Sequence, residues 1–285
     1  MIGKQQQAEF LLEAMPYIEK YQNKILVIKY GGNAMLGDEL KLSVMRDLSI
    51  LRFVGIKVVL VHGGGPEISQ TLQRMGIESK FVGGLRYTDE ETAEVVRMVL
   101  AGKVNKSLVH MLGAFGAKAI GICGMDGNMM LCEKESEELG FVGKITKVNP
   151  EIILDCLDKG YLPVISSVGF DAEGNIYNVN ADTAASAIAG ALKAESLILM
   201  TDTKGLLADK DDENSLIRKV YVSDISSLVK EGVIVGGMIP KVNCCKEAIR
   251  KGVNRVFITD GRVKHSILLE LLSDEGLGTM FVKGD

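Results

Sequence analysis

The sequence predicts an α/β fold, a three-layer αβα sandwich in which helices cover both faces of a central, mainly parallel, open sheet. Short apolar runs alternate along the chain with longer segments of helical periodicity, and this alternation is typical of parallel strands joined by helical crossovers. Several of the runs end in glycines or polar residues, at the C-terminal strand ends where open α/β sheets bind ligands. Strands are expected at residues 24–30, 56–62, 117–122, 161–167, 195–202 and 254–260.

Helices and hairpins are expected between these strands. Residues 38–53 and 66–75 follow the first two strands and carry apolar side chains at helical spacing. Two hairpin-like segments, residues 79–85 and 169–177, interrupt the alternation.

A separate amphipathic helix is expected over residues 5–21, ahead of the first strand. Its apolar side chains recur at helical spacing, at Ala8, Leu11, Leu12, Met15 and Ile18. Pro16 is expected to kink or break this helix. The apolar stripe needs a surface to cover it, which is either the core of the same chain or the same helix of a second subunit.

The composition argues against several classes of protein. The 285 residues are 47% hydrophobic and 25% charged, which indicates a globular protein of one large domain or two lobes. A net charge of −4 with scattered basic residues argues against a nucleic-acid or membrane surface. The chain has neither an apolar signal segment nor a run of about 18 apolar residues, so we expect a cytoplasmic protein. Five cysteines without CxxC spacing and only three histidines predict reduced, mostly buried thiols and no metal site.

Two glycine-rich stretches follow the first two strands. Lys29 lies two residues before Gly31 and Gly32, and glycines 63–65 lead into a helix. Glycines let a ligand approach backbone N–H groups, and a helix N-terminus favours an anion. Together the stretches predict a phosphate site between neighbouring strands. The alternatives are a flexible loop and a solvated lysine.

A further glycine pair leads to an arginine that is a candidate for binding an acceptor. Gly83 and Gly84 precede Arg86, which comes just before a helix with the capping-box pattern Thr88-x-x-Glu91. A guanidinium at this position can hold a carboxylate bidentately, or it can form an ordinary surface ion pair.

Two further groups of candidate site residues lie at the starts of two other predicted helices. Asn178, Asn180 and Asp182 alternate with small residues ahead of an alanine-rich helix. Either Asn180 or Asp182 could cap that helix. A cap uses one side chain, so it does not explain why all three residues are polar. Near the C-terminus, a glycine pair precedes Lys241 at the start of another helix.

These residues fit one reaction type. The chain contains no Walker A, GxGxxG or GxSxG motif, which argues against a P-loop enzyme, a dinucleotide dehydrogenase and a serine hydrolase. Two lysines, two glycine loops and one aspartate instead fit phosphoryl transfer to a carboxylate. Such an acceptor, with a pKa of about 4.3, is ionised at pH 7 and needs no base, so the site must supply charge neutralisation and positioning. A hydroxyl acceptor with Asp182 as the base remains an alternative.

Six motifs occur in order across almost the whole chain: KYGGNAM, VHGGGPEI, GGLRYTD, YNVNADTAA, LILMTDTKGLL and GGMIPKV. Together they resemble the motifs of the N-acetyl-L-glutamate kinases in the amino acid kinase family. Aspartokinases and glutamate 5-kinases share single motifs, whereas the combination of GGLRYTD with NVNAD is more specific. The resemblance implies the amino-acid kinase fold and transfer of a phosphoryl group from ATP to N-acetyl-L-glutamate in arginine biosynthesis. It also implies an acetylglutamate-binding lobe over residues 23–193 and a lobe for ATP, with Mg²⁺ carried by the nucleotide, over residues 194–285.

The resemblance also implies roles for individual residues. The implied catalytic set is Lys29, Asp182, Lys241, Gly32 and Gly64. In this set the lysines would neutralise the transferring group, the aspartate would hold both lysines, and the glycines would donate backbone N–H bonds. The residues implied in acceptor binding are Gly64, Gly65, Arg86 and Asn178. The residues implied in nucleotide binding are Thr201, Asp202, Gly237 and Lys241.

A last resemblance is to the arginine-inhibited members of the family. The helix within residues 1–22 is similar to the N-terminal extension of the hexameric, arginine-sensitive kinases. It implies a homohexamer, a trimer of dimers, that L-arginine inhibits allosterically. The implied effector residues are His265, Glu270 and Gly276. The alternatives are a kinase for aspartate or glutamate and an arginine-sensing binding protein without catalysis.

Overall fold

A computed structural model describes residues 3–35, 37–209 and 211–284. Its centre is an eight-stranded sheet with the order β12-β14-β13-β11-β1-β2-β8-β5. The strands are β1 (Ile25–Tyr30), β2 (Lys57–His62), β5 (Ala119–Cys123), β8 (Leu162–Ser166), β11 (Ser196–Thr201), β12 (Lys219–Tyr221), β13 (Arg255–Asp260) and β14 (Thr279–Val282). All neighbours pair in parallel except β13 and β14. The six predicted strands and the mainly parallel sheet are confirmed, whereas β12 and β14 were not predicted.

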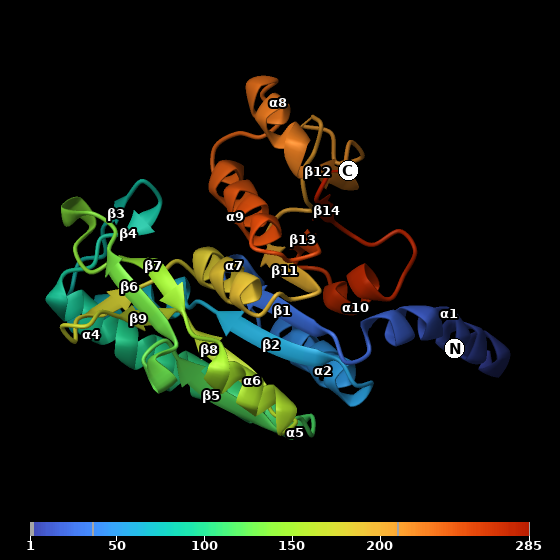
Figure 1. Cartoon of the computed structure of the whole chain (residues 1–285), viewed down its shortest axis with the longest axis horizontal. Coiled ribbons are helices and arrows are strands. Elements are labelled where there is room, and N and C mark those ends of the chain that lie inside the picture. Colours follow the sequence, from blue (N-terminus) through green and yellow to red (C-terminus); the bar gives the residue numbers. More distant parts are fainter. Residues whose placement is uncertain (1–2, 36, 210, 285) are drawn as a thin grey trace.

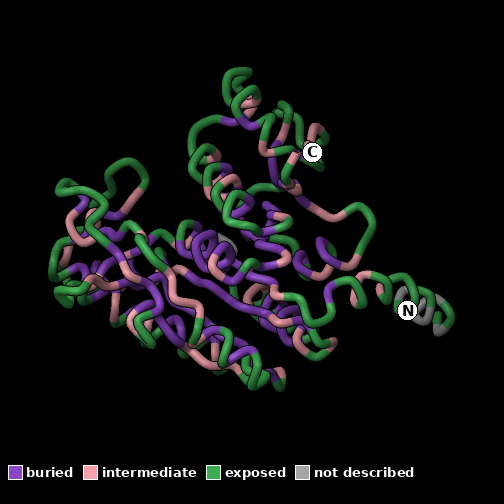
Figure 2. The backbone as a smooth tube through the Cα atoms, viewed as in Figure 1, coloured by how far each residue is buried: buried purple, intermediate pink, exposed green. Residues whose placement is uncertain are grey.

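Helices cover both faces of this sheet (Figure 1). The α-helices of the described residues are α1 (Lys4–Tyr21), α2 (Asp38–Phe53), α3 (Gly65–Met75), α4 (Glu90–Arg97), α5 (Asn105–Ala114), α6 (Glu151–Asp158), α7 (Ala181–Ala191), α8 (Ile225–Lys230), α9 (Met238–Arg250) and α10 (Ser266–Leu271). Successive side chains of β1 point to opposite layers: Leu26 and Ile28 pack with α2, α3 and α5, whereas Val27 packs with α6, α7 and α9. The burial view shows the central strands enclosed between these layers (Figure 2). The three-layer αβα sandwich is therefore confirmed.

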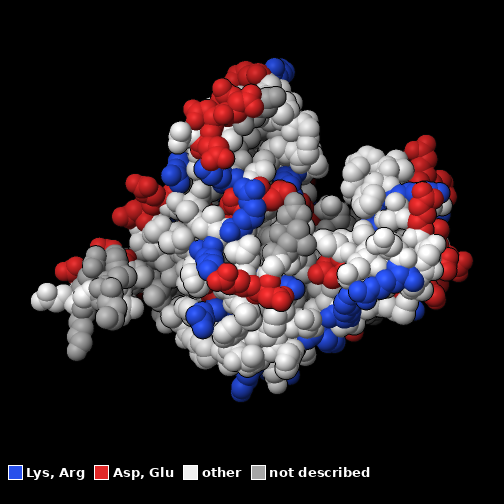
Figure 3. Space-filling model, turned by 180° about the vertical axis from the view of Figure 1, so that it is seen from behind, with Lys and Arg blue, Asp and Glu red and all other residues white. Residues whose placement is uncertain are grey.

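A smaller sheet and a hairpin form an arm beside the large sheet. The smaller sheet has the order β10-β9-β6-β7. Its strands are β6 (Met130–Lys134), β7 (Gly143–Val148), β9 (Val168–Phe170) and β10 (Ile176–Asn178), and the hairpin pairs β3 (Phe81–Val82) with β4 (Leu85–Arg86). The sequence predicted the β3–β4 and β9–β10 hairpins but not β6 and β7. Seen from behind, the surface is hollowed between this arm and the C-terminal part that carries α8 and α9 (Figure 3).

Helix α1 projects away from the body of the chain (Figure 1). Of the kink or break expected at Pro16, the break does not occur: the helix runs continuously from Lys4 to Tyr21 with Pro16 inside it. A proline removes one backbone N–H bond to the preceding turn, and the rest of the helix persists without that bond. Leu11 and Leu12 are 70% exposed and Met15 is 55% exposed, while the side chain of Ala8 lies outside the described part. In this chain alone, most of the apolar stripe has no surface to cover it.

The remaining sequence-based expectations concern thiols and membranes. All five cysteines are free; four are buried and Cys244 is partly buried, as predicted. No helix among the described residues is long and apolar enough to cross a bilayer.

Candidate active site

The two glycine loops predicted at the ends of β1 and β2 lie against each other. The Gly63 N–H donates to the Tyr30 carbonyl at 3.1 Å. A Cβ atom added to Gly31 would lie only 3.3 Å from Lys29 Cε and 3.5 Å from the Gly63 nitrogen. Because parallel strands end at the same edge of the sheet, both loops lie beside the first turns of α3 and α7.

Close packing explains why the second loop consists of glycines. A Cβ atom on Gly64 would lie 2.7 Å from Leu100 Cδ2 and 3.2 Å from Val104 Cγ2, so a larger residue would displace the loop. A Cβ atom on Gly63 would lie 3.3 Å from the Ala181 Cβ atom at the start of α7. Gly64 is also the N-cap of α3, where the first backbone N–H groups of the helix lack helical partners. The loop therefore packs closely against the start of α7, and the Gly64 N–H has no acceptor among the described residues.

The carboxylate of Asp182 holds two lysines. Lys29 Nζ lies 2.9 Å from Oδ1 and Lys241 Nζ lies 2.9 Å from Oδ2. Lys29 comes from β1, Asp182 from the first turn of α7 and Lys241 from the first turn of α9. Burial alone would raise the pKa of Asp182, but the two ammonium groups outweigh it and the pKa lies below its ordinary value. An ionised carboxylate held in this way is a poor proton acceptor, which argues against the alternative with Asp182 as a base.

Asn180 caps α7 and leaves Asp182 free for the lysines. The Asn180 side-chain oxygen accepts bonds from the Asp182 N–H at 2.9 Å and the Thr183 N–H at 3.1 Å. This is the usual arrangement of an N-cap asparagine. Of the two candidates for the cap, Asn180 takes that position.

Arg86 is buried and bound by neutral groups. Its guanidinium donates to the Gly65 carbonyl at 3.1 Å, to Ser69 Oγ at 2.9 Å and to Ser79 Oγ, and it lies over the Phe81 ring. Burial lowers the pKa of Arg86 from its ordinary value, although a guanidinium keeps its charge in proteins. Within residues 3–35, 37–209 and 211–284, no carboxylate forms an ion pair with it. The surface ion pair considered as the alternative is therefore not the observed arrangement.

Asn178 connects to Arg86 through a threonine. Asn178 Nδ2 donates to Thr88 Oγ1 at 3.2 Å, and Thr88 Oγ1 donates to the Arg86 carbonyl at 2.8 Å. The predicted cap at Thr88 is wrong: α4 begins at Glu90, and the Asp89 carboxylate caps it by accepting the Thr92 N–H at 2.8 Å. Thr88 is fully buried in a bridge to the segment before β7, so its hydroxyl is engaged elsewhere.

Sequence patterns gave no signal for Ser69, Ser79 or Thr88 as partners of the predicted residues. Ser69 lies on α3, and Ser79 precedes the hairpin. Their contacts with Arg86 depend on the hairpin folding back over α3, which is a tertiary arrangement.

The residues implied in nucleotide binding lie on the C-terminal half of the chain. Thr201 is the last residue of β11, and its hydroxyl accepts the Thr203 N–H at 3.1 Å. Asp202 follows it and is exposed. Gly237 is the N-cap of α9, and a Cβ atom on it would meet only open space. Since β11 pairs with β1, these residues and Lys241 face the same edge of the sheet as the lysine–aspartate group.

The residues implied in effector binding lie in a separate C-terminal segment. Glu270 is buried, and its Oε2 accepts the Leu277 N–H at 2.9 Å and the Gly278 N–H at 2.8 Å. His265 Nδ1 lies 2.6 Å from Asp47 Oδ1 on α2, and Gly276 adopts a left-handed φ of 61°. The structure thus places these residues around α10, apart from Asp182.

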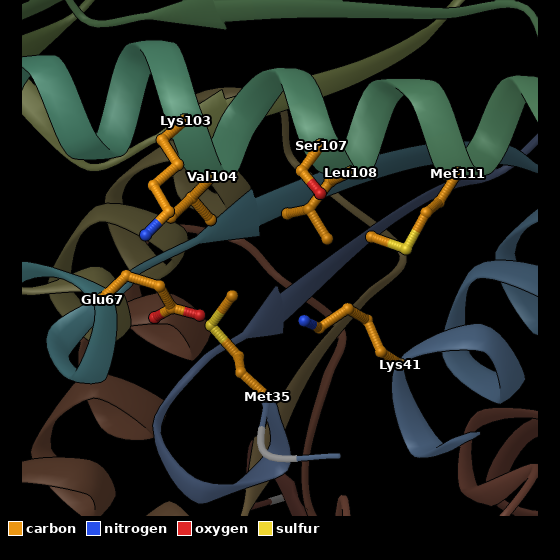
Figure 4. Close-up of a pocket in the computed structure, with 8 residues that line it drawn as sticks. All are labelled: Met35, Lys41, Glu67, Lys103, Val104, Ser107, Leu108 and Met111. Atoms are coloured by element: carbon orange, nitrogen blue, oxygen red, sulfur yellow. The ribbon is translucent and has the colours of Figure 1, made fainter. Parts of the chain in front are cut away.

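A cavity of about 110 Å³ is lined by residues of α2, α3 and α5 and of the segments before α2 and α5 (Figure 4). The side chains of Lys41, Lys103 and Glu67 point into it (Figure 4). Glu67 and Val104 line this cavity and also lie within 4 Å of the position that a Cβ on Gly64 would take. Two residues of the cavity wall therefore also pack against the glycine loop. Among the described residues, no group of three or more His, Cys, Asp or Glu side chains could hold a metal ion.

Comparisons with known proteins identify the family of this chain. The model of the amino acid kinase family matches residues 24–260. The chain is 57% identical to the acetylglutamate kinase of Clostridioides difficile (strain 630) over 279 residues, which cover 98% of each chain. It is 54% identical to the acetylglutamate kinase of Brachyspira hyodysenteriae (strain ATCC 49526 / WA1) over 99% of each chain.

Solved structures share the fold at lower identity. N-acetylglutamate synthase from Neisseria gonorrhoeae, complexed with coenzyme A and N-acetyl-glutamate, superposes with a TM-score of 0.84 and 23% identity. That match covers 98% of this chain and 64% of the synthase. Carbamate kinase from Giardia lamblia bound to AMP-PNP superposes with a TM-score of 0.68 and 18% identity, over 92% of this chain and 99% of that chain. On the sequence match and the shared fold, the chain belongs to the amino acid kinase family.

Proposed function

We propose that this chain transfers the terminal phosphoryl group of ATP to the side-chain carboxylate of N-acetyl-L-glutamate, forming N-acetyl-L-glutamyl 5-phosphate in the cytoplasm. The observation that carries the proposal is the Lys29–Asp182–Lys241 group, with both ion pairs at 2.9 Å, beside two glycine loops. Identities of 57% and 54% to acetylglutamate kinases, over nearly the whole chain, support this acceptor.

The reaction needs charge neutralisation more than proton transfer. An oxygen of the ionised acceptor carboxylate attacks the γ-phosphorus, and the bond to the β,γ-bridging oxygen breaks as ADP leaves. Negative charge spreads over the transferred group in the transition state. Lys29 and Lys241 supply positive charge on two sides of that group, and Asp182 fixes the positions of both ammonium groups.

In the acceptor-binding lobe, residues 23–193, backbone N–H groups and the buried arginine bind the two substrates. The N–H groups of Gly32 and Gly64 donate to oxygens of the transferring phosphoryl group. Arg86 and Asn178, joined through Thr88, clamp the α-carboxylate of the acceptor, with Gly65 beside them. A buried guanidinium without a carboxylate partner among the described residues supports this assignment.

The nucleotide half covers residues 194–285. Thr201, Asp202 and Gly237 lie at the C-terminal edge of the sheet and contact ATP, and Lys241 reaches its terminal phosphate. Mg²⁺ would be carried by the nucleotide and would supply further positive charge beside its phosphates.

We further propose feedback inhibition by L-arginine in a homohexamer that is a trimer of dimers. The exposed stripe on α1, with Leu11, Leu12 and Met15, supports an interface between subunits. Tyr17 on α1 donates a hydrogen bond to Asp274, which connects this helix to the segment that holds Glu270 and Gly276. The synthase from Neisseria gonorrhoeae is also known in complex with coenzyme A and L-arginine, and that structure superposes with a TM-score of 0.81.

One assay tests both proposals. MgATP consumption is measured with N-acetyl-L-glutamate, L-glutamate or L-aspartate, each with and without L-arginine. Turnover with the acetylated acceptor alone, reduced by arginine, is the expected result. Preference for aspartate or glutamate would refute the acceptor assignment, and turnover that arginine leaves unchanged would refute the regulation. Arginine binding without turnover of any acceptor would favour an arginine-sensing protein.

A further inference from the structure

His62, the last residue of β2, is fully buried next to the glycine loop. Its Nδ1 lies 2.8 Å from the carbonyl oxygen of Gly63. A carbonyl oxygen can only accept a hydrogen bond, so Nδ1 carries the proton and donates it.

Asn105 fixes the other side of the imidazole ring. Its Nδ2 lies 3.1 Å from His62 Nε2 and 2.9 Å from the Val164 carbonyl oxygen. The Asn105 Oδ1 accepts a bond from Lys106 Nζ at 3.2 Å, and this ammonium also donates to the Gly121 carbonyl at 2.8 Å. The amide nitrogen of Asn105 is thus the donor, and Nε2 of His62 is the unprotonated acceptor.

The histidine stays neutral in this setting. Burial is the main cause that lowers the pKa of His62 to about 4; the nearby Lys106 charge acts in the same direction, and together they outweigh the hydrogen bond to the Gly63 carbonyl, which raises it. A single tautomer, with the proton on Nδ1, satisfies both of its neighbours.

The fold makes room for the asparagine. A Cβ atom on Gly121 of β5 would lie 1.8 Å from Asn105 Oδ1, so only glycine leaves space for the amide there. Asn105 follows a seven-residue π-helix, Met98–Val104, which changes the helical phase just before it. π-helical turns are rare and frequently occur at functional sites.

The hydrogen bonds that run from Asn105 through His62 end on the peptide group between Gly63 and Gly64. The Gly63 carbonyl and the Gly64 N–H belong to one planar trans unit and point in opposite directions. Holding the carbonyl toward His62 therefore directs the N–H away from the core. The Gly64 N–H has no acceptor among the described residues.

We propose that His62, held as its Nδ1–H tautomer by Asn105, is a positioning residue that aims the Gly64 N–H at the transferring phosphoryl group. This inference rests on the proposed donor role of Gly64. It explains why a neutral, inaccessible histidine lies beside a site whose chemistry needs no base. The effect is on the transition state, because the oxygens of the transferred group gain charge there and the N–H bond to them strengthens.

A matched pair of variants tests the proposal. His62→Asn keeps an N–H donor at the same number of bonds from the backbone as Nδ1, whereas His62→Leu has a methyl group there. Both variants lack the Nε2 atom that accepts the Asn105 hydrogen bond. The loss of that bond should therefore destabilise both to a similar extent. We expect His62→Leu to lower kcat roughly ten- to hundredfold, somewhat less than outright removal of one oxyanion donor, with little change in either KM. His62→Asn should recover most of that loss. Equal kcat values in folded samples of the two variants would overturn the positioning role.

Nitrogen NMR of the wild-type protein gives a second test that does not depend on the variants folding. The chain has only three histidines, so ¹⁵N-histidine labelling gives few signals to assign. His62 should show a protonated Nδ1 and an unprotonated Nε2, unchanged through about pH 6.5, where an ordinary histidine titrates. An Nε2–H tautomer or an imidazolium would refute the inferred hydrogen bonds. The inferred tautomer together with wild-type kcat in His62→Leu would overturn the positioning role, whereas the proposed kinase function would stand or fall separately, by turnover of N-acetyl-L-glutamate in the wild type.

Discussion

Replacing Asp182 by asparagine tests the central ion pairs most directly. In the wild type each carboxylate oxygen lies 2.9 Å from one ammonium group. The variant keeps the shape but leaves Lys29 and Lys241 facing each other without a negative charge. At a separation of about 6 Å and an effective dielectric constant of about 20, their repulsion is about 3 kcal/mol.

That figure agrees with the cost of breaking a buried ion pair, about 3–5 kcal/mol. The Lys29 and Asp182 side chains are 9% and 12% exposed, but Lys241 is 25% exposed. Because solvent near Lys241 screens its charge, we expect the free energy of unfolding to fall by about 3 kcal/mol, the lower end of that range. We also expect kcat to fall by about two to three decades, since the lysines lose the group that positions them.

Denaturant unfolding with and without MgATP measures the effect. The nucleotide phosphates supply the negative charge that Asp182→Asn lacks, so MgATP should stabilise the variant more than the wild type. Asp158→Asn is the control: it removes the partner of Lys57 at 2.8 Å, but Asp158 is 71% exposed and the change should cost at most about 1 kcal/mol. If Asp182→Asn has wild-type stability and MgATP stabilises it no more than the wild type, then the Asp182 charge does not offset the repulsion between Lys29 and Lys241.

Four further predictions concern single features of the site and of α1. Lys241→Ala should lower kcat by about two to three decades, and an unchanged kcat in steady-state assays would exclude its role. Arg86→Lys should raise the KM for the acceptor about tenfold or more with a smaller effect on kcat, because a hydrogen bond to a charged group contributes about 1.5–3 kcal/mol; unchanged acceptor KM would contradict the clamp. Deleting residues 1–20 should convert hexamers to dimers and relieve arginine inhibition, and sedimentation of an unaltered hexamer would refute this. The lowered pKa of Asp182 contributes stability above its unfolded pKa of about 3.9, which is lost as the pH falls through the folded pKa. The stability difference between wild type and Asp182→Asn should therefore shrink below about pH 4 in urea titrations, and a constant difference would contradict the assigned pKa.

Sequence patterns located most of the large sheet because its strands are buried on both faces. Strands β1 and β2 are continuous apolar runs closed by glycines, and helix α2 was predicted with the bounds that it has, Asp38–Phe53. Strands β6 and β7 were missed because they mix charged and apolar residues and pair on a small, partly exposed sheet. Their stability comes from tertiary packing, which short-range periodicity does not report.

Local patterns predicted the site by residue type but not by contact. Glycine loops and lysines carry a local signal and made Lys29 and Lys241 candidates, whereas the contact of both lysines with Asp182 was expected only from the family resemblance. The cap of α4 was misplaced by one residue because Thr88 and Asp89 are both good N-cap residues. Only the buried bridge at Thr88 decides between them, and that bridge forms with a segment about fifty residues away along the chain.

The convergence of helix N-termini explains how so few charged side chains can accommodate a polyphosphate. Helices α3, α7 and α9 all begin at this edge of the sheet, at Gly65, Ala181 and Met238. Each N-terminus carries partial positive charge. The turn before α3 also has backbone N–H groups without helical partners, whereas the first N–H groups of α7 and α9 bond to Asn180, Val235 and Gly236. The cap of α7 is the neutral Asn180, so capping that helix adds no second negative charge beside Asp182. Because one carboxylate faces two ammonium groups, the side-chain group keeps a net positive charge. An arriving phosphate therefore meets backbone donors and excess lysine charge together, whereas an aspartate at the cap would have cancelled that excess.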